Sequence, residues 1–284
     1  MPTLSRGNAR IHYDDLGSGE LVVMVHGLTE NALYWGVTGI ASRLSARRRV
    51  VSIDLRAHGR TVVAGEPRGF DVTTMATDIE ALADHLGQER FHLVSHATGG
   101  MVALRVAMRD HRRLASLILT DTGAATQPGR QDPRDVMAPR YAGRGWEDIM
   151  SSLRADPGLF LGQLDLHPDR ERLWALFEEM ARLGDPEVIA AFVRSFYDDP
   201  DPHAPWLRKI RCPTLVLLGE HDRLFIKPSR LLAAEIPGAE LVVLTGVGHM
   251  TALEAPEETY SAIAGFIERH PMARPSEGDQ TVVR

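Results

Sequence analysis

The sequence predicts an α/β fold with a mostly parallel central sheet flanked by helices and an inserted helical cap. Two observations predict this class. Short apolar runs rich in valine, isoleucine and leucine alternate with segments of helical periodicity, as the buried strands of a parallel sheet and their covering helices require. The alternation then stops for one long stretch that holds only helical patterns. The predicted strands are residues 21–26, 49–55, 91–96, 114–121, 214–220 and 240–246.

The first well-marked helix lies between the second and third of these strands. Asp71 is expected to cap its start and Gly87 to end it. Before the first strand, the segment "ARIHYDDLGSGE" alternates in polarity and predicts a further strand and a turn into the sheet. In the helix between the second and third strands, the apolar positions step by three and four residues along one face: Val72, Met75, Ile79, Leu82 and Leu86.

The long interruption of the strand pattern predicts the cap. It holds three helical stripes, and Asp185 followed by Pro186 predicts the start of the last one. Segments that resemble catalytic loops flank this stretch on both sides, so we expect a cap over a site rather than an excursion that only completes the core. The predicted organisation is a core of residues 1–124 and 210–271, a cap of residues 125–209 and a disordered tail of residues 272–284.

The composition is that of a globular protein with a sizeable core, because 44% of the 284 residues are hydrophobic and 25% are charged. A net charge of -6 offers no basic surface for nucleic acid or an anionic membrane, so the expected partner is a small molecule. The N-terminal segment lacks the apolar run of a secretory signal, which predicts a cytoplasmic location.

Metal and cofactor chemistry is not expected. The chain has a single cysteine, Cys212, and its 12 histidines are scattered without a paired ligand spacing. The sequence therefore predicts no metal site and no cofactor, and it leaves the oligomeric state open.

One segment, "LVSHATGG" at residues 93–100, has the order strand, tight turn of small residues, helix. This is the pattern of a G-x-S-x-G nucleophile elbow, whose central serine projects above the sheet. The central residue here is Ala97, with Ser95 and Thr98 at positions that do not project in the same way. An aspartate nucleophile is absent too, so a covalent ester intermediate is not available to this chain.

Four further segments, in the right order, resemble those of the α/β-hydrolase fold family, particularly its capped esterases, lactonases and carbon–carbon bond hydrolases. The similarity covers nearly the whole chain. "VMVHGLTEN" is similar to the family's His-Gly oxyanion loop, "DLRAHGRT" to the loop after the next strand, "LLGEHDRL" to the strand end that bears the acid, and "GVGHM" to the histidine loop.

The resemblance implies a role for each matched position. His249 would be the general base, and Asp222 would fix its tautomer and orientation. The backbone N–H groups of Leu28 and Thr98 would form an oxyanion hole. Asp121 follows the strand before the cap, where some relatives carry the acid, but Asp222 is the expected acid.

The residues expected to contact a substrate are Gly27, His96 and Trp146. His96 could instead turn inward under the following helix, and His26 and His58 are expected to be structural. Aromatic side chains of the cap suit a modest, mostly apolar ligand with a carbonyl group, which leaves ester, lactone, amide and vinylogous diketone open.

Ala97 leaves three functions open. The leading expectation is a serine hydrolase whose nucleophile has been replaced, inactive as it stands and able to hold its ligand. The second is a natural enzyme in which the His249–Asp222 pair activates water or abstracts a substrate proton. Alanine at the elbow can be natural, because some members of the α/β-hydrolase family that resemble putative aminoacrylate hydrolases carry it at this position. The third is a non-catalytic binding protein, which retention of the pair argues against.

Overall fold

The structure is a computed structural model that describes residues 2–66, 68–124, 132–197 and 204–272. In this part of the chain, nine strands form one sheet in the order β1-β2-β4-β3-β6-β7-β8-β9, with β5 paired to β2. Neighbouring strands are parallel along the row β4-β3-β6-β7-β8-β9, whereas β2 is antiparallel to each of its neighbours. The predicted mostly parallel sheet is therefore confirmed. The strands are Thr3–Arg6 (β1), Ala9–Gly17 (β2), Leu21–Val25 (β3), Arg49–Ile53 (β4), Val62–Val63 (β5), Phe91–His96 (β6), Leu114–Thr120 (β7), Thr214–Gly219 (β8) and Glu240–Leu244 (β9).

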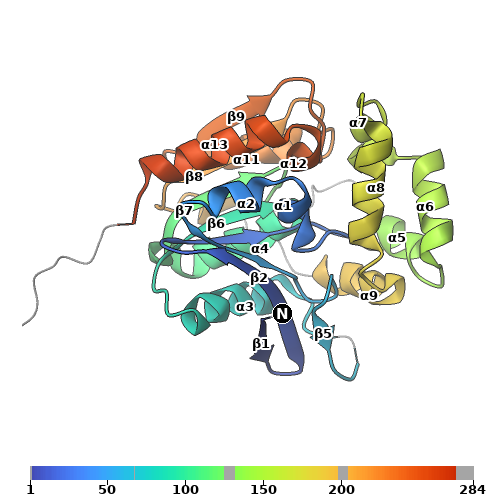
Figure 1. The fold of residues 1–284 in the computed structure, drawn as a ribbon, viewed down its shortest axis with the longest axis horizontal. Coiled ribbons are helices and arrows are strands. Elements are labelled where there is room, and N and C mark those ends of the chain that lie inside the picture. The colour runs from blue at the N-terminus through green and yellow to red at the C-terminus, as the bar shows by residue number, and fades with distance from the viewer. Residues whose placement is uncertain (1, 67, 125–131, 198–203, 273–284) are drawn as a thin grey trace, which may run out of the picture.

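Helices cover both faces of this sheet (Figure 1). Successive residues of β3 are all buried but point to opposite faces, so Val23 and Val25 belong to one apolar cluster and Val22 and Met24 to another. Helices α3 and α4 contribute to the first cluster, and α1, α2 and α13 to the second. The helices of the core are Leu33–Val37 (α1), Ile40–Leu44 (α2), Val72–His85 (α3), Thr98–Asp110 (α4), Ile226–Glu235 (α11), Thr251–Glu254 (α12) and Pro256–Arg269 (α13).

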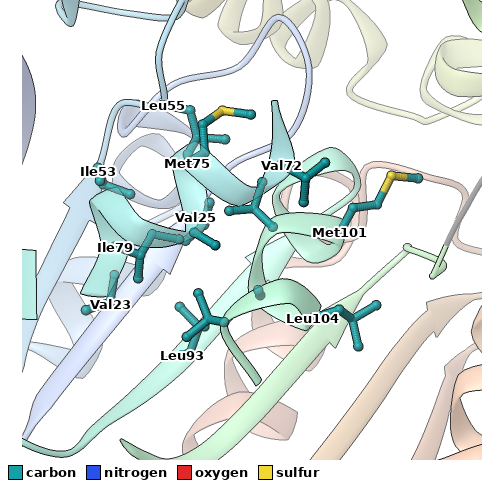
Figure 2. Close-up of a cluster of buried hydrophobic side chains, with 14 of the residues drawn as sticks. Val23, Val25, Ile53, Leu55, Val72, Met75, Ile79, Leu93, Met101 and Leu104 are labelled. Carbon is teal, nitrogen blue, oxygen red and sulfur yellow. The ribbon is translucent and has the colours of Figure 1, made fainter. Parts of the chain in front are cut away.

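Figure 2 shows part of the first cluster: Ile79 of α3 lies beside Val25 of β3, and Val72 lies nearer to Met101 of α4. The predicted caps of this helix are confirmed. The side chain of Asp71 accepts a hydrogen bond from the Thr74 N–H at 2.7 Å, and Gly87 beyond its end has a positive φ of 71°.

The helices between β7 and β8 lie together beside the sheet (Figure 1). Asp185 starts α9 as predicted, because its side chain accepts from the Glu187 N–H at 2.9 Å. Helix α7 has no helical stripe of its own in the sequence and is not predicted by it. The elements of this stretch are Pro133–Met137 (α5), a short 3-10 turn at Ala138–Arg140, Trp146–Ala155 (α6), Gly158–Asp165 (α7), Arg170–Ala181 (α8), Pro186–Phe196 (α9) and Ala204–Leu207 (α10).

We call α5 to α9 the cap. It is joined to the core by apolar packing and by a hydrogen bond from the Asn31 side chain to the Met180 carbonyl at 2.7 Å. Phe192 and Phe196 of α9 belong to the same buried cluster as Phe70 of the core. The division into core and cap at residues 125 and 209 stays a prediction. The predicted disordered tail of residues 272–284 lies outside the described residues from residue 273 onward.

Candidate active site

Ala97 occupies the sharp turn between β6 and α4. Its φ of 49° and ψ of -118° belong to a region that residues with a Cβ rarely adopt. Two hydrogen bonds fix the turn: the Ala97 N–H donates to the Thr120 carbonyl at 3.0 Å, and the Thr122 hydroxyl donates to the Ala97 carbonyl at 2.6 Å. The strained backbone of an elbow is therefore present although its side chain is a methyl group.

Glycines after the turn let α4 approach the sheet closely. A Cβ on Gly99 would overlap the His26 carbonyl oxygen, and a Cβ on Gly100 would overlap the Thr122 side chain. Only glycine fits at these two positions without movement of the backbone or of a buried side chain. The small residues of the pattern are thus explained by packing.

His249 and Asp222 meet near the carboxyl ends of the strands. Nδ1 of His249 lies 2.9 Å from Oδ2 of Asp222. The other oxygen of Asp222 accepts from the N–H groups of Leu224 and Phe225, each at 3.0 Å. Burial raises the pKa of the Asp222 carboxyl, but the charge and hydrogen bond of His249 with the two backbone donors outweigh burial and leave the pKa lowered. Asp222 can therefore stay ionised and orient the imidazole.

Asp121 serves another purpose in this structure. Its oxygens accept from the Gly219 N–H at 2.9 Å and from the Thr251 hydroxyl at 2.6 Å, which ties the turn after β7 to the end of β8 and to the start of α12. Burial first and the charge of Asp222 second raise the pKa of the Asp121 carboxyl well above its usual range. The geometry brings Asp222, and not Asp121, to the ring of His249.

Aromatic rings surround the imidazole of His249. Phe225 stacks on it at 5.4 Å between centroids and 21° between planes, and Phe160 of the cap meets it edge-on at 5.1 Å. Among the residues that the structure describes, none donates to or accepts from Nε2 of His249. This nitrogen is therefore free to take a proton from a bound molecule.

The loop of His249 is held by one carboxylate. Glu254 accepts from the Gly248 N–H at 2.6 Å and from the Met250 N–H at 3.0 Å. A Cβ on Gly248 would overlap the side chain of Gln163 on α7. The cap therefore packs closely on the histidine loop.

The predicted oxyanion loop lies against the elbow. A Cβ built on Gly27 would come within 2.9 Å of the Ala97 Cβ. Thr98 is the first residue of α4, where backbone N–H groups have no acceptor within the helix. In the described part of the chain, no hydrogen bond leaves the N–H of Leu28 or of Thr98. Their role as oxyanion donors stays a prediction.

His96 turns inward, under the elbow, and its side chain has no exposed surface. Nε2 donates to the His249 carbonyl at 2.9 Å, and Nδ1 lies 3.0 Å from a carboxylate oxygen of Glu30. The ring of Tyr34 stacks on it at 4.7 Å. Both nitrogens of His96 are occupied, which leaves none for the substrate contact that the sequence predicts.

Trp146 lies at the start of α6, and its hydrogen bond and its ring pairing join it to residues of the cap. Its indole N–H donates to the Gly184 carbonyl at 2.8 Å, and its ring meets Tyr141 at 6.4 Å. Its contact with a substrate stays a prediction.

His26 and His58 are buried and bonded to backbone, as structural residues are. Nδ1 of His26 donates to the Gly27 carbonyl at 2.7 Å and Nε2 accepts from the Leu55 N–H at 3.0 Å. His58 donates from Nδ1 to the Arg56 carbonyl at 2.9 Å, and burial lowers its pKa to about 3. Both rings are therefore neutral.

The sequence did not reveal the role of Glu30. It is 3% exposed, and its carboxylate accepts from the Gly27 N–H at 2.5 Å as well as meeting His96. The one signal in the sequence is an acidic residue in "HGLTEN", close behind a run of five buried apolar residues. Its partner is 66 positions away.

Within the described ranges, no three or more histidine, cysteine, aspartate or glutamate side chains gather as metal ligands would. No helix in those ranges combines the length and the apolar character that crossing a membrane requires.

Comparisons with known proteins agree with this fold. Residues 22–262 match the alpha/beta hydrolase family. The chain is 31% identical to a putative carbamate hydrolase, RutD, of a Caulobacter species, over 90% of this chain and 94% of the relative. It is 29% identical to the 2-hydroxy-6-oxo-6-phenylhexa-2,4-dienoate hydrolase of Burkholderia cepacia, over 87% of each chain.

Solved structures with a similar fold include a thermophilic esterase from Thermogutta terrifontis, with a TM-score of 0.80 and 27% identity over 93% of this chain and 95% of that one. The enol-lactonase from Burkholderia xenovorans LB400 has a TM-score of 0.80 over 94% of this chain and 100% of that one. Its 22% identity supports the fold alone.

Proposed function

Because this chain belongs to the α/β hydrolase family, we propose that it binds a small, mostly apolar carbonyl compound beside Ala97 and cannot form the acyl-enzyme of a serine hydrolase. One observation carries the proposal: the 2.9 Å contact of His249 with Asp222 is retained beside an elbow that keeps its strained backbone. A carbonyl substrate is supported by relatives named as a putative carbamate hydrolase, a 2-hydroxy-6-oxo-6-phenylhexa-2,4-dienoate hydrolase and an esterase. Ester, lactone, amide and vinylogous diketone are the classes in question.

The proposed binding mode follows from the free polar groups. The carbonyl oxygen would accept from the N–H groups of Leu28 and Thr98, donors worth roughly 3 to 4 kcal/mol once the oxygen becomes negative. The carbonyl carbon would lie above the methyl of Ala97. Without a hydroxyl there, no bond forms to the protein, and the ligand is held unreacted.

A second candidate function is supported by the free Nε2 of His249. A water molecule between this nitrogen and the substrate could lose a proton to Nε2 while its oxygen bonds to the carbonyl carbon. The imidazolium would then return that proton to the leaving group as the bond to the carbonyl carbon breaks. This route needs the base, the acid and the oxyanion donors, and it does not need a nucleophile at position 97.

The test compares the parent chain with Ala97→Ser, Ala97→Gly and His249→Ala on a panel of short-chain 4-nitrophenyl esters, lactones and carbamates. If the chain is a serine hydrolase without its nucleophile, Ala97→Ser should raise turnover by on the order of 10⁴-fold, because the members of a triad act as a unit. Ala97→Gly is the matched control, since it changes the same residue without adding a hydroxyl.

The general-base route gives the opposite pattern. The parent then turns over already, His249→Ala abolishes the activity, and Ala97→Ser adds little. Calorimetric binding of a panel compound with no turnover by any of the variants would contradict both enzymatic functions for that compound.

A further inference from the structure

A buried pair of side chains lies behind Ala97 and has no part in the reaction proposed above. Nδ1 of His96 is 3.0 Å from Oε1 and 3.1 Å from Oε2 of Glu30. Glu30 is 3% exposed and His96 is 0% exposed. Such a pair is costly to remove from water, and burial of a pair is not in itself a gain in stability.

Each end of the pair holds a different loop of the site. At one end, Glu30 accepts from the Gly27 N–H at 2.5 Å, in the loop that carries the predicted oxyanion donor Leu28. At the other end, Nε2 of His96 donates to the backbone carbonyl of His249 at 2.9 Å. These two loops follow β3 and β9, and the pair connects them directly beneath residue 97.

The geometry also fixes the protons of the pair. A carbonyl oxygen only accepts, so Nε2 of His96 carries a proton. Burial raises the pKa of the Glu30 carboxyl, but the charge and hydrogen bond of His96 together with the Gly27 N–H outweigh burial and lower it, so Glu30 is a carboxylate. Nδ1 of His96 therefore carries a proton as well, and the ring is an imidazolium. Burial lowers the pKa of His96, but the charge and hydrogen bond of Glu30 outweigh burial and raise it to about 9.

Other groups facing His96 come from several elements. Oδ2 of Asp121, after β7, lies 3.9 Å from Nε2, and the rings of Tyr34 and His249 are 4.7 Å and 4.9 Å away. The neutral His26 lies in the loop after β3, where its Nδ1 donates to the Gly27 carbonyl. Glu30 is the carboxylate in hydrogen-bond contact with the ring.

We infer that Glu30 and His96 are positioning residues, whose ion pair sets the distance between the oxyanion loop and the His249 loop around residue 97. The inference rests on the proposed function, because it is on a carbonyl group that those two loops would act together. Loss of His96 leaves the Glu30 carboxylate buried without its counterpart, and loss of Glu30 removes the charge that keeps the His96 ring protonated. Either loss removes the link between the two loops and lets them move independently.

The first test does not depend on any activity. In full-length protein labelled with ¹⁵N-histidine, NMR at pH 7.5 should show a doubly protonated ring that is absent from His96→Gln. Glu30→Gln should make that ring neutral. Glu254→Gln is the matched control, since it removes a buried carboxylate that accepts backbone N–H groups in the neighbouring loop and has no hydrogen bond to a histidine side chain. A neutral His96 in the parent at pH 7.5 would overturn the inference.

The second test measures positioning. In the Ala97→Ser background, a fluorophosphonate should label the new serine, and adding Glu30→Gln should slow labelling by roughly 10- to 100-fold, the effect of a small misplacement of reacting groups. Glu30→Asp keeps the charge and should recover part of the rate. Equal labelling rates for folded Ala97→Ser with and without Glu30→Gln would overturn the inference.

A third measurement separates this inference from the proposed function. If Ala97→Ser is not labelled at all, the proposed function fails. Hydrogen exchange of the Gly27 amide then still tests whether Glu30 holds the oxyanion loop. The amide should be protected in the parent and in Glu254→Gln and exposed in Glu30→Gln. Unchanged protection in Glu30→Gln would overturn the inference.

Discussion

Gly27 lies directly against Ala97, so that a methyl group on its Cα would stand 2.9 Å from the Ala97 Cβ and 3.1 Å from Oε2 of Glu30. The contact joins the turn after β3 to the turn after β6, and it leaves space for a hydrogen atom only. Whatever chemistry occurs at residue 97 therefore depends on the absence of a side chain at residue 27.

Gly27→Ala should lower the free energy of unfolding by about 1–3 kcal/mol, the usual cost of overpacking a buried contact. Gly36→Ala is the control, because Gly36 lies in α1 and a Cβ there meets nothing within 4 Å. Urea denaturation of both variants and the parent measures the difference. Equal stability of Gly27→Ala and the parent would mean that the two turns separate easily.

Ala97→Gly should stabilise the protein by about 1 kcal/mol, because glycine removes the strain of a positive φ while adding some freedom to the unfolded chain. Ala103→Gly in the middle of α4 should instead destabilise it by about 1 kcal/mol or more, the ordinary cost of glycine in a helix. Thermal and urea unfolding measure both. Loss of stability in Ala97→Gly would contradict the assignment of strain to this turn.

Asp222→Asn in the Ala97→Ser background should lower kcat by about 10⁴-fold, since the amide favours the wrong tautomer of His249. Asp121→Asn should change kcat by less than about 10-fold, because Asp121 bonds Gly219 and Thr251 rather than the ring. Steady-state kinetics on one ester compares the two. The reverse order of effects would make Asp121 the acid.

The pH dependence of stability should change in His96→Gln. The pKa of His96 is raised from its usual 6.5 to about 9, so its contribution is complete below pH 6.5 and is lost as the pH rises through 9. Between these values, the free energy of unfolding of the parent should fall relative to the variant, by up to about 1.4 kcal/mol per pH unit. Urea midpoints at pH 6, 7, 8 and 9 measure it. Parallel curves would mean that His96 is neutral.

The sequence predicts the parts of this fold whose pattern is local. Short runs of mainly apolar residues, all buried in the structure, mark β3, β6, β7 and β8. The N-cap of α3 is local too, because Asp71 accepts from the N–H of Thr74, three residues further along the chain. The short edge strands β1 and β5 are not predicted, because two to four residues give no period. Helix α7 is missed for a related reason, since its 8 residues are too few for the apolar spacing to repeat.

In the site, the sequence predicts residues that lie in recognisable loops. It misses residues whose role depends on contact with a side chain distant in sequence. Asp222 and His249 could be named from their segments, and the structure brings them together. The direction of His96 could not be predicted, because it depends on Glu30, which comes from another loop. The partners of Asp121 could not be predicted either, because Gly219 and Thr251 come from distant parts of the chain.

The insertion of the cap also determines the order in which the site can form during synthesis. Strands β7 and β8 are neighbours, with Leu117 beside Thr214 and Thr120 beside Leu217, although the whole cap separates them along the chain. Contacts so distant in sequence form slowly, and until β8 arrives the edge of β7 has no strand beside it. The elbow and the oxyanion loop precede this edge, whereas Asp222 and His249 follow it. A nascent chain therefore contains the elbow and the predicted oxyanion loop well before Asp222 and His249 are synthesised.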